Sequence, residues 1–306
     1  MIILKKHSSI GFALVPFFSL LWGEPPAPEI KAELGIIYSR VGGMELKLNA
    51  FIPQGVKEPA PAMLFIHGGW WSGGRPPGNM QGGRWQRFTR KGIALFSNQY
   101  RLGKKGGFPE NIRDGRNAVR YIRKYARHFN IDPDRIGVFG TSAGSHLSMM
   151  VAVAPQDFED GGPTEGLEGV SAKVCNAFAI VGPTDFVRQW NESVQGKPNN
   201  ARPYFKVLFK GREPDTGKNK AFYMKMCPMG HLRKDVPPML ICDGEKDPVV
   251  TGLHGKVFVE KLKSLGADAT YWMTPGGGHG WPGGKGFTDV LDGFLLRTLK
   301  IGREGQ

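Results

Sequence analysis

The chain has 306 residues, of which 40% are hydrophobic and 22% are charged, and its formal net charge is +14. This apolar content is too high for a disordered chain, and the 44 glycines show no three-residue period, which excludes a collagen-like chain. A length near 300 residues suffices for one large α/β domain. No repeat of about 20–50 residues is visible, so solenoids and propellers are excluded as well.

The first residues have the pattern of a secretory signal. Lys5 and Lys6 precede an apolar run over 10–22, which is too short to span a bilayer. A basic segment followed by a short apolar segment is typical of a signal peptide. We therefore expect residues 1–23 to be removed, and the protein to be secreted or periplasmic with no stable membrane association afterwards. The alternative is a hydrophobic N-terminal strand or helix that packs on the domain.

The basic residues are scattered along the chain. The densest set is a stripe of five arginines at helical spacing between residues 113 and 127. Because the opposite face of that helix is apolar, we interpret the stripe as a solvated helix face. Nucleic-acid binding would also need base-reading or stacking elements, and none is visible, so no nucleic-acid partner is predicted.

The three cysteines, Cys175, Cys227 and Cys242, are an odd number without CxxC spacing. No zinc pattern fits them, and no metal site is predicted. Cys175 and Cys242 lie in apolar, strand-like runs, so we expect small core residues there. One disulfide plus one free thiol is the alternative.

Predicted strands and helices alternate along most of the chain after a Pro-rich segment, 24–33, which we interpret as a linker. Several strands are continuous apolar runs such as 63–66, which suit a parallel sheet buried on both faces. The expected strands are 35–41, 45–52, 62–67, 93–98, 135–139, 176–181, 239–242 and 269–273. The expected helices are 110–128, 142–150, 253–265 and 288–300. This alternation predicts a single α/β domain over 34–306, with a mostly parallel eight-stranded sheet and helices on both faces.

One long stretch, at about 184–236, interrupts this alternation. It carries several Lys, Pro and aromatic residues. Long loops of this kind are uncommon in compact domains and often form lids or binding loops. We interpret it as a cap- or lid-like insertion over a site, and a plain surface excursion is the alternative.

The sharpest local signal is the segment Gly140-Thr141-Ser142-Ala143-Gly144, between an apolar strand and a helical pattern. In a G-x-S-x-G turn the small residues let the backbone bend sharply and lift the serine hydroxyl clear of the sheet. The helix that begins there directs its N–H groups and positive dipole end toward the serine. Ser142 is therefore the predicted nucleophile.

A glycine-rich loop with the sequence HGGWW follows the strand at 62–67. Such a loop lets backbone N–H groups converge on one point, which acyl transfer needs to stabilise the oxyanion of its tetrahedral intermediate. We assign the N–H groups of Gly69 and Trp70 to this oxyanion hole, joined by that of Ala143. His67 is expected to brace the loop rather than to act as a base.

Two late loops offer an acid and a base. Asp247 follows the seventh predicted strand, where a carboxylate can orient a histidine, and Asp243 is its rival because it lies nearer the strand. His279 lies in a glycine-rich loop after the last predicted strand, from which its ring can reach Ser142. Among the seven histidines, only His279 follows the acid in such a loop.

The order Ser142, Asp247, His279 is the one that the α/β-hydrolase architecture produces. With both glycine-rich motifs, the chain resembles the esterase/lipase superfamily of α/β-hydrolases over about 35–300. It is most similar to the bacterial feruloyl- and acetyl-esterase-like branch, near the hormone-sensitive-lipase-like carboxylesterases. Trp70 stands where the latter usually have a third glycine, which favours the former branch. The resemblance implies an α/β-hydrolase fold.

The expected reaction is ester hydrolysis by a Ser-His-Asp triad. His279 would take the proton from Ser142 and Asp247 would stabilise the imidazolium, after which water hydrolyses an acyl-enzyme. No metal and no cofactor is predicted, because this chemistry requires neither.

The aromatic residues Trp71, Tyr100 and Trp281 are expected around the pocket, where they could stack on a sugar or a feruloyl ring; ordinary packing is the alternative. The expected protein is a secreted serine carboxylesterase for short-chain or aromatic acyl esters. Its predicted substrates are small-molecule or polysaccharide esters, with acetyl or feruloyl groups favoured. The alternatives are a lipase or peptidase of the same fold, or a non-catalytic carbohydrate-binding protein, which would typically lack a triad member.

Overall fold

The computed structural model describes residues 27–56, 59–155, 158, 162–195, 209 and 219–302. The predicted signal peptide over 1–23 lies outside these residues. Within the described ranges, no helix combines the length and the apolar character that crossing a membrane requires.

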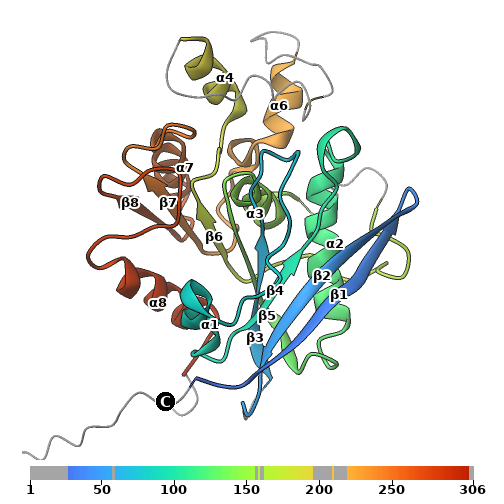
Figure 1. Cartoon of the computed structure of the whole chain (residues 1–306). Helices are drawn as coiled ribbons and strands as arrows, with labels where there is room; N and C mark the ends of the chain where they lie inside the picture. Colours follow the sequence, from blue (N-terminus) through green and yellow to red (C-terminus); the bar gives the residue numbers. More distant parts are fainter. Residues whose placement is uncertain are drawn as a thin grey trace, which may run out of the picture.

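A single sheet of eight strands organises the described residues, in the order β1-β2-β4-β3-β5-β6-β7-β8 (Figure 1). The strands are β1 (Ile30–Val41), β2 (Met44–Pro53), β3 (Ala60–Ile66), β4 (Ala94–Asn98), β5 (Ile131–Thr141), β6 (Ala177–Ile180), β7 (Met239–Gly244) and β8 (Ala269–Thr274). β2 is antiparallel to β1 and to β4, and every other neighbouring pair is parallel. The mostly parallel sheet of the α/β-hydrolase fold that the sequence predicts is confirmed.

Helices cover both faces of this sheet. They are η1 (Gly83–Trp85), α1 (Gln86–Thr89), η2 (Gly103–Lys105), α2 (Glu110–Lys124), α3 (Ala143–Val153), α4 (Phe186–Val194), α6 (Lys220–Met226), η3 (Pro228–His231), α7 (Leu253–Ser264) and α8 (Phe287–Thr298). Buried side chains of α2, α3 and α7 share a core with one face of the sheet. Those of α1 and α8 share a second core with the other face, and Figure 1 shows these two helices side by side.

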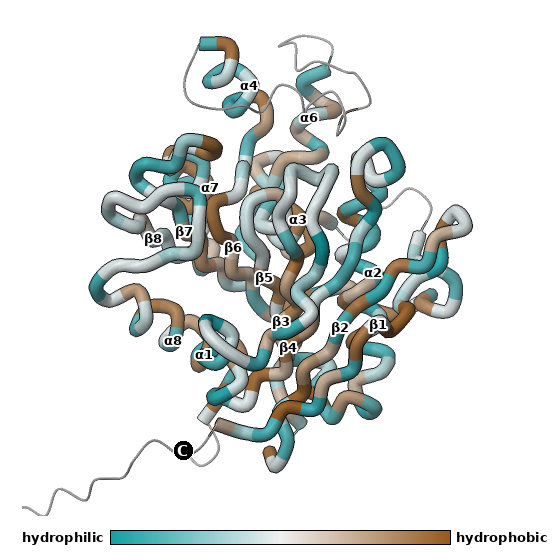
Figure 2. Tube along the Cα trace, viewed as in Figure 1, coloured by the Kyte–Doolittle hydropathy of each residue, from teal (hydrophilic) through white to brown (hydrophobic). Residues whose placement is uncertain are grey.

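The central strand β3 shows why its sequence is a continuous apolar run. Leu64 and Ile66 join the core with α2 and α3, whereas Met63 and Phe65 join the core with α8. Figure 2 shows the apolar character concentrated in the central strands, β3 among them. Because both faces are covered, no polar residue is needed at alternate positions.

The predicted linker over 24–33 ends earlier than the sequence indicates. β1 begins at Ile30, and Ile30 to Glu33 pair with Pro53 to Ala50 of β2. This stretch has no proline, so its N–H groups can join the ladder and cover an edge of β2 that would otherwise be open. The prolines, at 25, 26 and 28, all precede β1, and the last four residues of the predicted linker belong to that strand.

The predicted insertion at about 184–236 is described only over 184–195, at 209 and over 219–236. These residues hold α4, α6 and η3, and Figure 1 shows α4 and α6 together at one end of the molecule, beyond the sheet. Asp185 caps α4, because its carboxylate accepts the N–H of Arg188 at 3.0 Å. The remainder of the insertion lies outside the described residues.

All three cysteines are free thiols. Cys227 and Cys242 are buried and Cys175 is half-buried. The interpretation of Cys242 as a small core residue is confirmed, and no disulfide links the three.

The arginine stripe of α2 is not the solvated face that its periodicity suggests. Arg116 and Arg120 are buried. Arg116 donates to the carbonyl of Pro155 at 2.9 Å, and Arg120 donates to that of Val170 at 3.1 Å. The stripe therefore holds the segment between α3 and β6 against α2. The periodicity located this face correctly, but the segment that covers it lies about 40–50 residues further along the chain.

Arg123 provides a test of this role, because its guanidinium donates to the carbonyls of Pro133 at 3.0 Å, Lys173 at 2.6 Å and Ser171. Charge-assisted bonds of this kind are lost together on truncation, so we expect Arg123→Ala to lower the free energy of unfolding by about 2–3 kcal/mol. The exposed Arg127 is the matched control, and Arg127→Ala should stay within about 0.5 kcal/mol. Urea unfolding measures both, and equal losses in the two variants would contradict the role.

Candidate active site

Ser142 lies on a sharp turn between β5 and α3. Its backbone dihedrals, φ 55° and ψ −121°, are strained for a residue other than glycine. Gly140 and Gly144 make the turn possible, because a Cβ on Gly140 would collide with the backbone of Gly144 and one on Gly144 with the carbonyl oxygen of Ile66. The N–H of Ser142 donates to the carbonyl of Ile180 at 2.8 Å, which ties the turn to β6. Both glycines of the motif are steric requirements.

Three side chains that are distant in the sequence meet beyond the carboxyl ends of β5, β7 and β8. Ser142 Oγ lies 2.9 Å from His279 Nε2, and His279 Nδ1 lies 2.8 Å from Asp247 Oδ2. The other carboxylate oxygen of Asp247 accepts the N–H groups of Val249 at 2.7 Å and Val250 at 3.0 Å. The Asp247 side chain is fully buried, whereas that of His279 is 23% exposed. In this geometry an imidazole can accept the hydroxyl proton while the carboxylate holds its ring.

Asp243, the rival acid, has a different environment. It is buried at the end of β7, and its carboxyl accepts the N–H of Gly255 at 3.1 Å, at the start of α7. Burial, reinforced by the nearby charge of Asp247, raises the pKa of Asp243 well above its usual range, which favours the protonated form. Asp247 is therefore the carboxylate that the structure brings to His279.

The glycine-rich loop after β3 lies against the Ser142 turn. A Cβ on Gly68 would lie 3.3 Å from that of Ser142. Gly69 has a φ of 122°, and Trp70 follows with a φ of 55°. Ala143 is the first residue of α3, so its N–H is one of those that a helix leaves without an intrahelical acceptor. The three predicted oxyanion donors thus come from two segments that touch beside the serine.

Tyr100, which the sequence suggested as a substrate contact, instead packs against the start of this loop. It is only 3% exposed, its hydroxyl donates to the carbonyl of His67 at 3.0 Å, and the two rings stack with centroids 4.5 Å apart. Burial lowers the pKa of His67, so that ring stays neutral at pH 7, as a brace requires. Tyr100 follows β4, the neighbour of β3, and this pairing brings its ring to His67, directly after β3.

Trp71, the second suggested substrate contact, is also a structural residue. Its side chain is buried, and its indole N–H donates to His146 Nδ1 at 3.2 Å. That bond makes Nδ1 the acceptor, so His146 Nε2 carries the proton and donates to the carbonyl of Met226 at 2.7 Å. The chain of contacts links the glycine-rich loop through α3 to the end of α6. Phe186 completes the packing, with its ring centroid 5.5 Å from that of Trp71.

Trp281 is the one suggested aromatic contact that stays partly exposed. It follows His279 by two residues, and its ring packs edge-on against Trp85 and Phe178 with centroids 6.0 and 5.8 Å away. The guanidinium carbon of Arg84 lies 5.1 Å from its ring centroid. Trp281 therefore remains a candidate for substrate binding.

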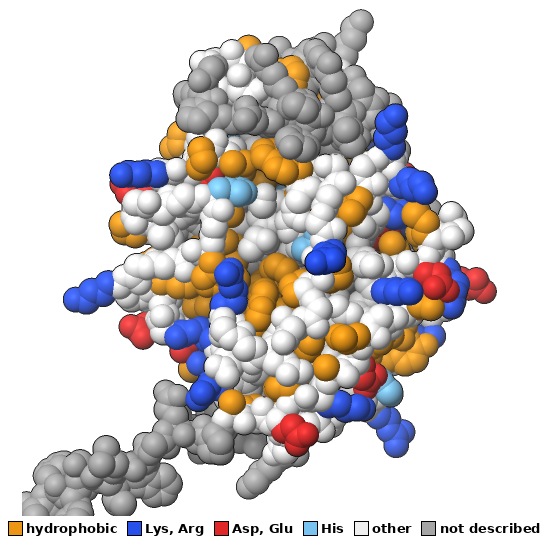
Figure 3. All heavy atoms as spheres, in the orientation of Figure 1, with side chains coloured by type: hydrophobic (Ala, Val, Ile, Leu, Met, Phe, Trp, Pro, Cys, Tyr) orange, Lys and Arg blue, Asp and Glu red, His pale blue; other side chains and the backbone are white. Residues whose placement is uncertain are grey.

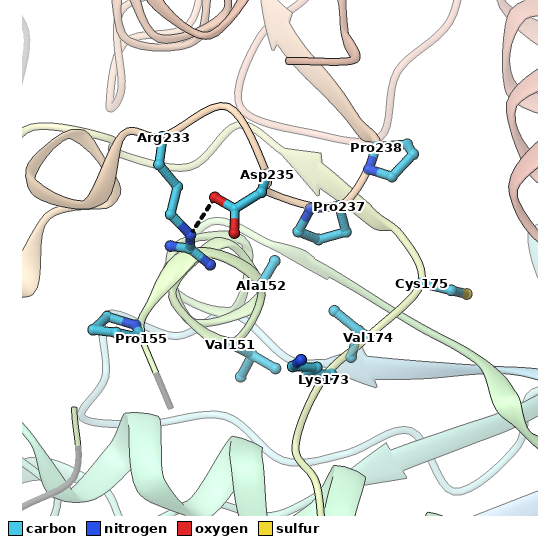
Figure 4. A pocket seen from close by; sticks show the side chains of 10 residues that line it. All are labelled: Val151, Ala152, Pro155, Lys173, Val174, Cys175, Arg233, Asp235, Pro237 and Pro238. Atoms are coloured by element: carbon cyan, nitrogen blue, oxygen red, sulfur yellow. Dashed lines mark ion pairs between the residues drawn. The ribbon is translucent and has the colours of Figure 1, made fainter. Parts of the chain in front are cut away.

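A separate hollow of about 520 Å³ adjoins the other end of α3 (Figure 4). Its wall includes Val151 and Ala152 near the last turn of that helix, and an ion pair of 3.0 Å between Arg233 and Asp235 crosses its rim. Because Ser142 precedes the first residue of α3, this hollow is distinct from the triad. Nowhere in the described ranges do three or more His, Cys, Asp or Glu side chains form a group that could hold a metal ion.

The chain is similar in sequence to known ester hydrolases. The BD-FAE family profile matches residues 48–262. Esterase LipC of Mycobacterium tuberculosis is 28% identical over 240 residues, which cover 77% of this chain and 55% of the relative. The probable carboxylic ester hydrolase LipM of the same organism is 26% identical over 211 residues, covering 67% and 46%. The chain thus spans about half the length of these curated relatives.

Solved structures share the fold. A truncated form of a carbohydrate esterase from gut microbiota superposes with a TM-score of 0.76 at 24% identity, covering 90% of this chain and 98% of that one. The thermophilic esterase Est2 of the planctomycete Thermogutta terrifontis, with butyrate bound, has a TM-score of 0.69 at 22% identity, covering 92% and 97%. At these identities the likeness establishes the architecture, whereas function depends on the site.

The buried His146 predicts a pH dependence of stability. Burial lowers its pKa from 6.5 to about 4 in the folded protein. Between pH 6.5 and pH 4 the unfolded chain binds more protons at this histidine than the folded protein does. The contribution of His146 to the free energy of unfolding is therefore fully present above pH 6.5. It falls by up to about 3 kcal/mol as the pH decreases toward 4. Denaturant unfolding between pH 7 and pH 4.5 measures this loss. His146→Gln should reduce the slope, and equal slopes for wild type and His146→Gln would exclude the assignment.

Proposed function

We infer that this chain, which belongs to the BD-FAE family of α/β-hydrolases, is a serine carboxylesterase. The observation that carries the proposal is the hydrogen-bonded series from Ser142 Oγ through the His279 ring to the buried Asp247 carboxylate. It lies beside a glycine-rich loop and a helix N-terminus, which is where an ester's developing oxyanion needs donors. The names of the relatives, which are esterases, support the same reaction class.

In the proposed mechanism each residue has one role. His279 Nε2 accepts the Ser142 proton as the oxygen attacks the ester carbonyl, while Asp247 holds the ring and stabilises the imidazolium. The N–H groups of Gly69, Trp70 and Ala143 would hold the oxyanion. The imidazolium then protonates the leaving alcohol, and the same ring activates the water that hydrolyses the acyl-enzyme.

The proposed substrates are short-chain or aromatic acyl esters, in particular acetyl or feruloyl groups on a polysaccharide. Two observations support a saccharide substrate: the half-buried Trp281 two residues after His279, and the carbohydrate esterase among the structures of the same fold. A secreted or periplasmic location, proposed from the basic and apolar segments over 1–23, would bring the enzyme to such a polymer.

Replacement of the nucleophile tests the reaction class. We expect Ser142→Ala to lower kcat for p-nitrophenyl acetate and methyl ferulate by at least about 10⁴-fold, with an unchanged circular dichroism spectrum. A fluorophosphonate probe should label Ser142 in the wild type, as mass spectrometry of the tryptic peptide would show. Absence of labelling would instead support a non-catalytic binding protein and refute the proposal.

A matched pair of carboxylates tests the choice of acid. Asp247→Asn should lower kcat by roughly 10⁴-fold, because the amide favours the wrong tautomer of His279. Asp243→Asn is the control, since burial already favours a neutral group at that position and an amide has nearly the same shape. We expect its kcat to stay within a few-fold of wild type. Steady-state kinetics on p-nitrophenyl acetate separates the two, and the reverse ranking would make Asp243 the catalytic acid.

A further inference from the structure

A basic groove of about 570 Å³ lies between α1 and α8, and Trp281 is one of its lining residues. The term basic groove refers here to the space lined by η1 and α1 on one side, and by the segment from Trp281 to Asp292 on the other. Its charged lining residues are Arg84, Arg87, Arg90, Lys91 and Asp292. Figure 3 shows blue side chains gathered around the positions of α1 and α8, next to an apolar recess.

One carboxylate serves two of these cations. Arg87 Nη1 lies 3.1 Å from Asp292 Oδ1, and Lys91 Nζ lies 2.9 Å from Asp292 Oδ2. Arg87 also donates to the carbonyl of Thr288 at 3.2 Å, which fixes its guanidinium on α8. The structure describes every residue that lines the groove, and Asp292 is the single acidic one among them. Because the basic lining residues outnumber it, the groove keeps a positive charge.

Among the cations that line the basic groove, Arg84 contacts an aromatic ring rather than an acid. Its guanidinium lies over Trp281, whose ring is itself held edge-on by Trp85 and Phe178. The side chain is exposed, and within the described part of the chain no ion pair engages it. A guanidinium that contacts the face of an aromatic ring can still donate two parallel N–H groups to a carboxylate.

One residue that lines the basic groove, Trp281, is close in sequence to the proposed catalytic base. Trp281 follows His279 by two residues, so their Cα atoms are at most about 7 Å apart. Of His279 and Trp281, Arg84 contacts only Trp281, through its ring. An anion bound at Arg84 and an ester at Ser142 can belong to one substrate molecule only if the anion lies in a part of that molecule beyond the reacting group.

We propose that the basic groove binds the carboxylate of a uronic-acid residue in the glycan chain that carries the ester. The proposal rests on the esterase function and narrows its substrate class to acidic saccharides. Bidentate Arg84 contacts with the carboxylate supply specificity, and the positive charge around Asp292 raises the local concentration of a polyanion. A neutral glycan has no anionic group to pair with these cations.

The test compares two ester substrates with different glycans, an acetylated oligogalacturonide and an acetylated xylo-oligosaccharide, with p-nitrophenyl acetate as a reporter of the triad. At low ionic strength the wild type should have a higher kcat/KM on the acidic substrate. Arg84→Gln should lower the acidic-to-neutral ratio of kcat/KM by roughly three- to tenfold, mainly through KM. Arg127→Gln, which removes the same charge after α2, should leave that ratio unchanged. Added salt of about 0.3 M should diminish the wild-type preference.

Equal kcat/KM values on the acidic and neutral esters, or an equal ratio in Arg84→Gln and wild type, would overturn the basic groove as a uronate site. If no ester is hydrolysed, p-nitrophenyl acetate included, the esterase proposal fails, and the groove is judged by calorimetric binding of unesterified oligogalacturonide. Weaker binding by Arg84→Gln than by Arg127→Gln would then support the site, and equal binding would refute it. A competition with polyuridylate is a further check, with its phosphate concentration equal to the carboxylate concentration of the oligogalacturonide. Displacement of the oligogalacturonide would show that any polyanion binds, and it would count against a uronate site.

Discussion

The close approach of the Ser142 turn to the end of β3 is the constraint on which the site depends. No side chain fits at Gly140 or Gly144, because the backbone of the turn and the carbonyl of Ile66 occupy the space. This contact places the start of α3 directly against the glycine-rich loop, and these two segments carry the proposed oxyanion donors. The strained backbone of Ser142 persists because these neighbours over-determine it. The positions of His279 and Asp247 at the ends of β8 and β7 follow from the parallel order of the same sheet.

Around this contact, aromatic and histidine side chains hold the glycine-rich loop in one conformation. Tyr100, which follows β4, donates to the carbonyl of His67 at the start of the loop. Trp71 ties the loop through His146 of α3 to the carbonyl of Met226 at the end of α6. A loop built from glycines has little conformational preference of its own, so its N–H groups can be preorganised only by such neighbours. The link to Met226 also couples the loop to α6, within the insertion that lies above the sheet. The proposed oxyanion hole is therefore held in place by side chains that do not themselves belong to it.

The positive charge of the chain is distributed for two different purposes. On α2 the arginines are turned inward, where Arg116 and Arg120 satisfy backbone carbonyls of an irregular segment. Between α1 and α8 the cations face a groove, and Asp292 neutralises them only in part. A net charge of +14 thus says little about partners until each cation is placed. The difference depends on what covers each surface, which neither composition nor periodicity contains.

Local patterns were sufficient for the architecture and for the segments that carry the site. Continuous apolar runs predicted central strands such as β3 and β4, because a strand buried on both faces needs an uninterrupted apolar sequence. The glycines around Ser142 predicted the turn for a steric reason that acts within five residues. The sequence favoured Asp247 over Asp243, and the bond between Asp247 and the His279 ring agrees with that choice. Such patterns did not reveal the bracing roles of Trp71 and Tyr100, the inward arginines of α2 or the start of β1 at Ile30. Each of them is settled by a contact between residues far apart along the chain. A side chain's own sequence neighbourhood specifies its period and its backbone, but only packing determines which distant atoms complete its hydrogen bonds and whether water still reaches it.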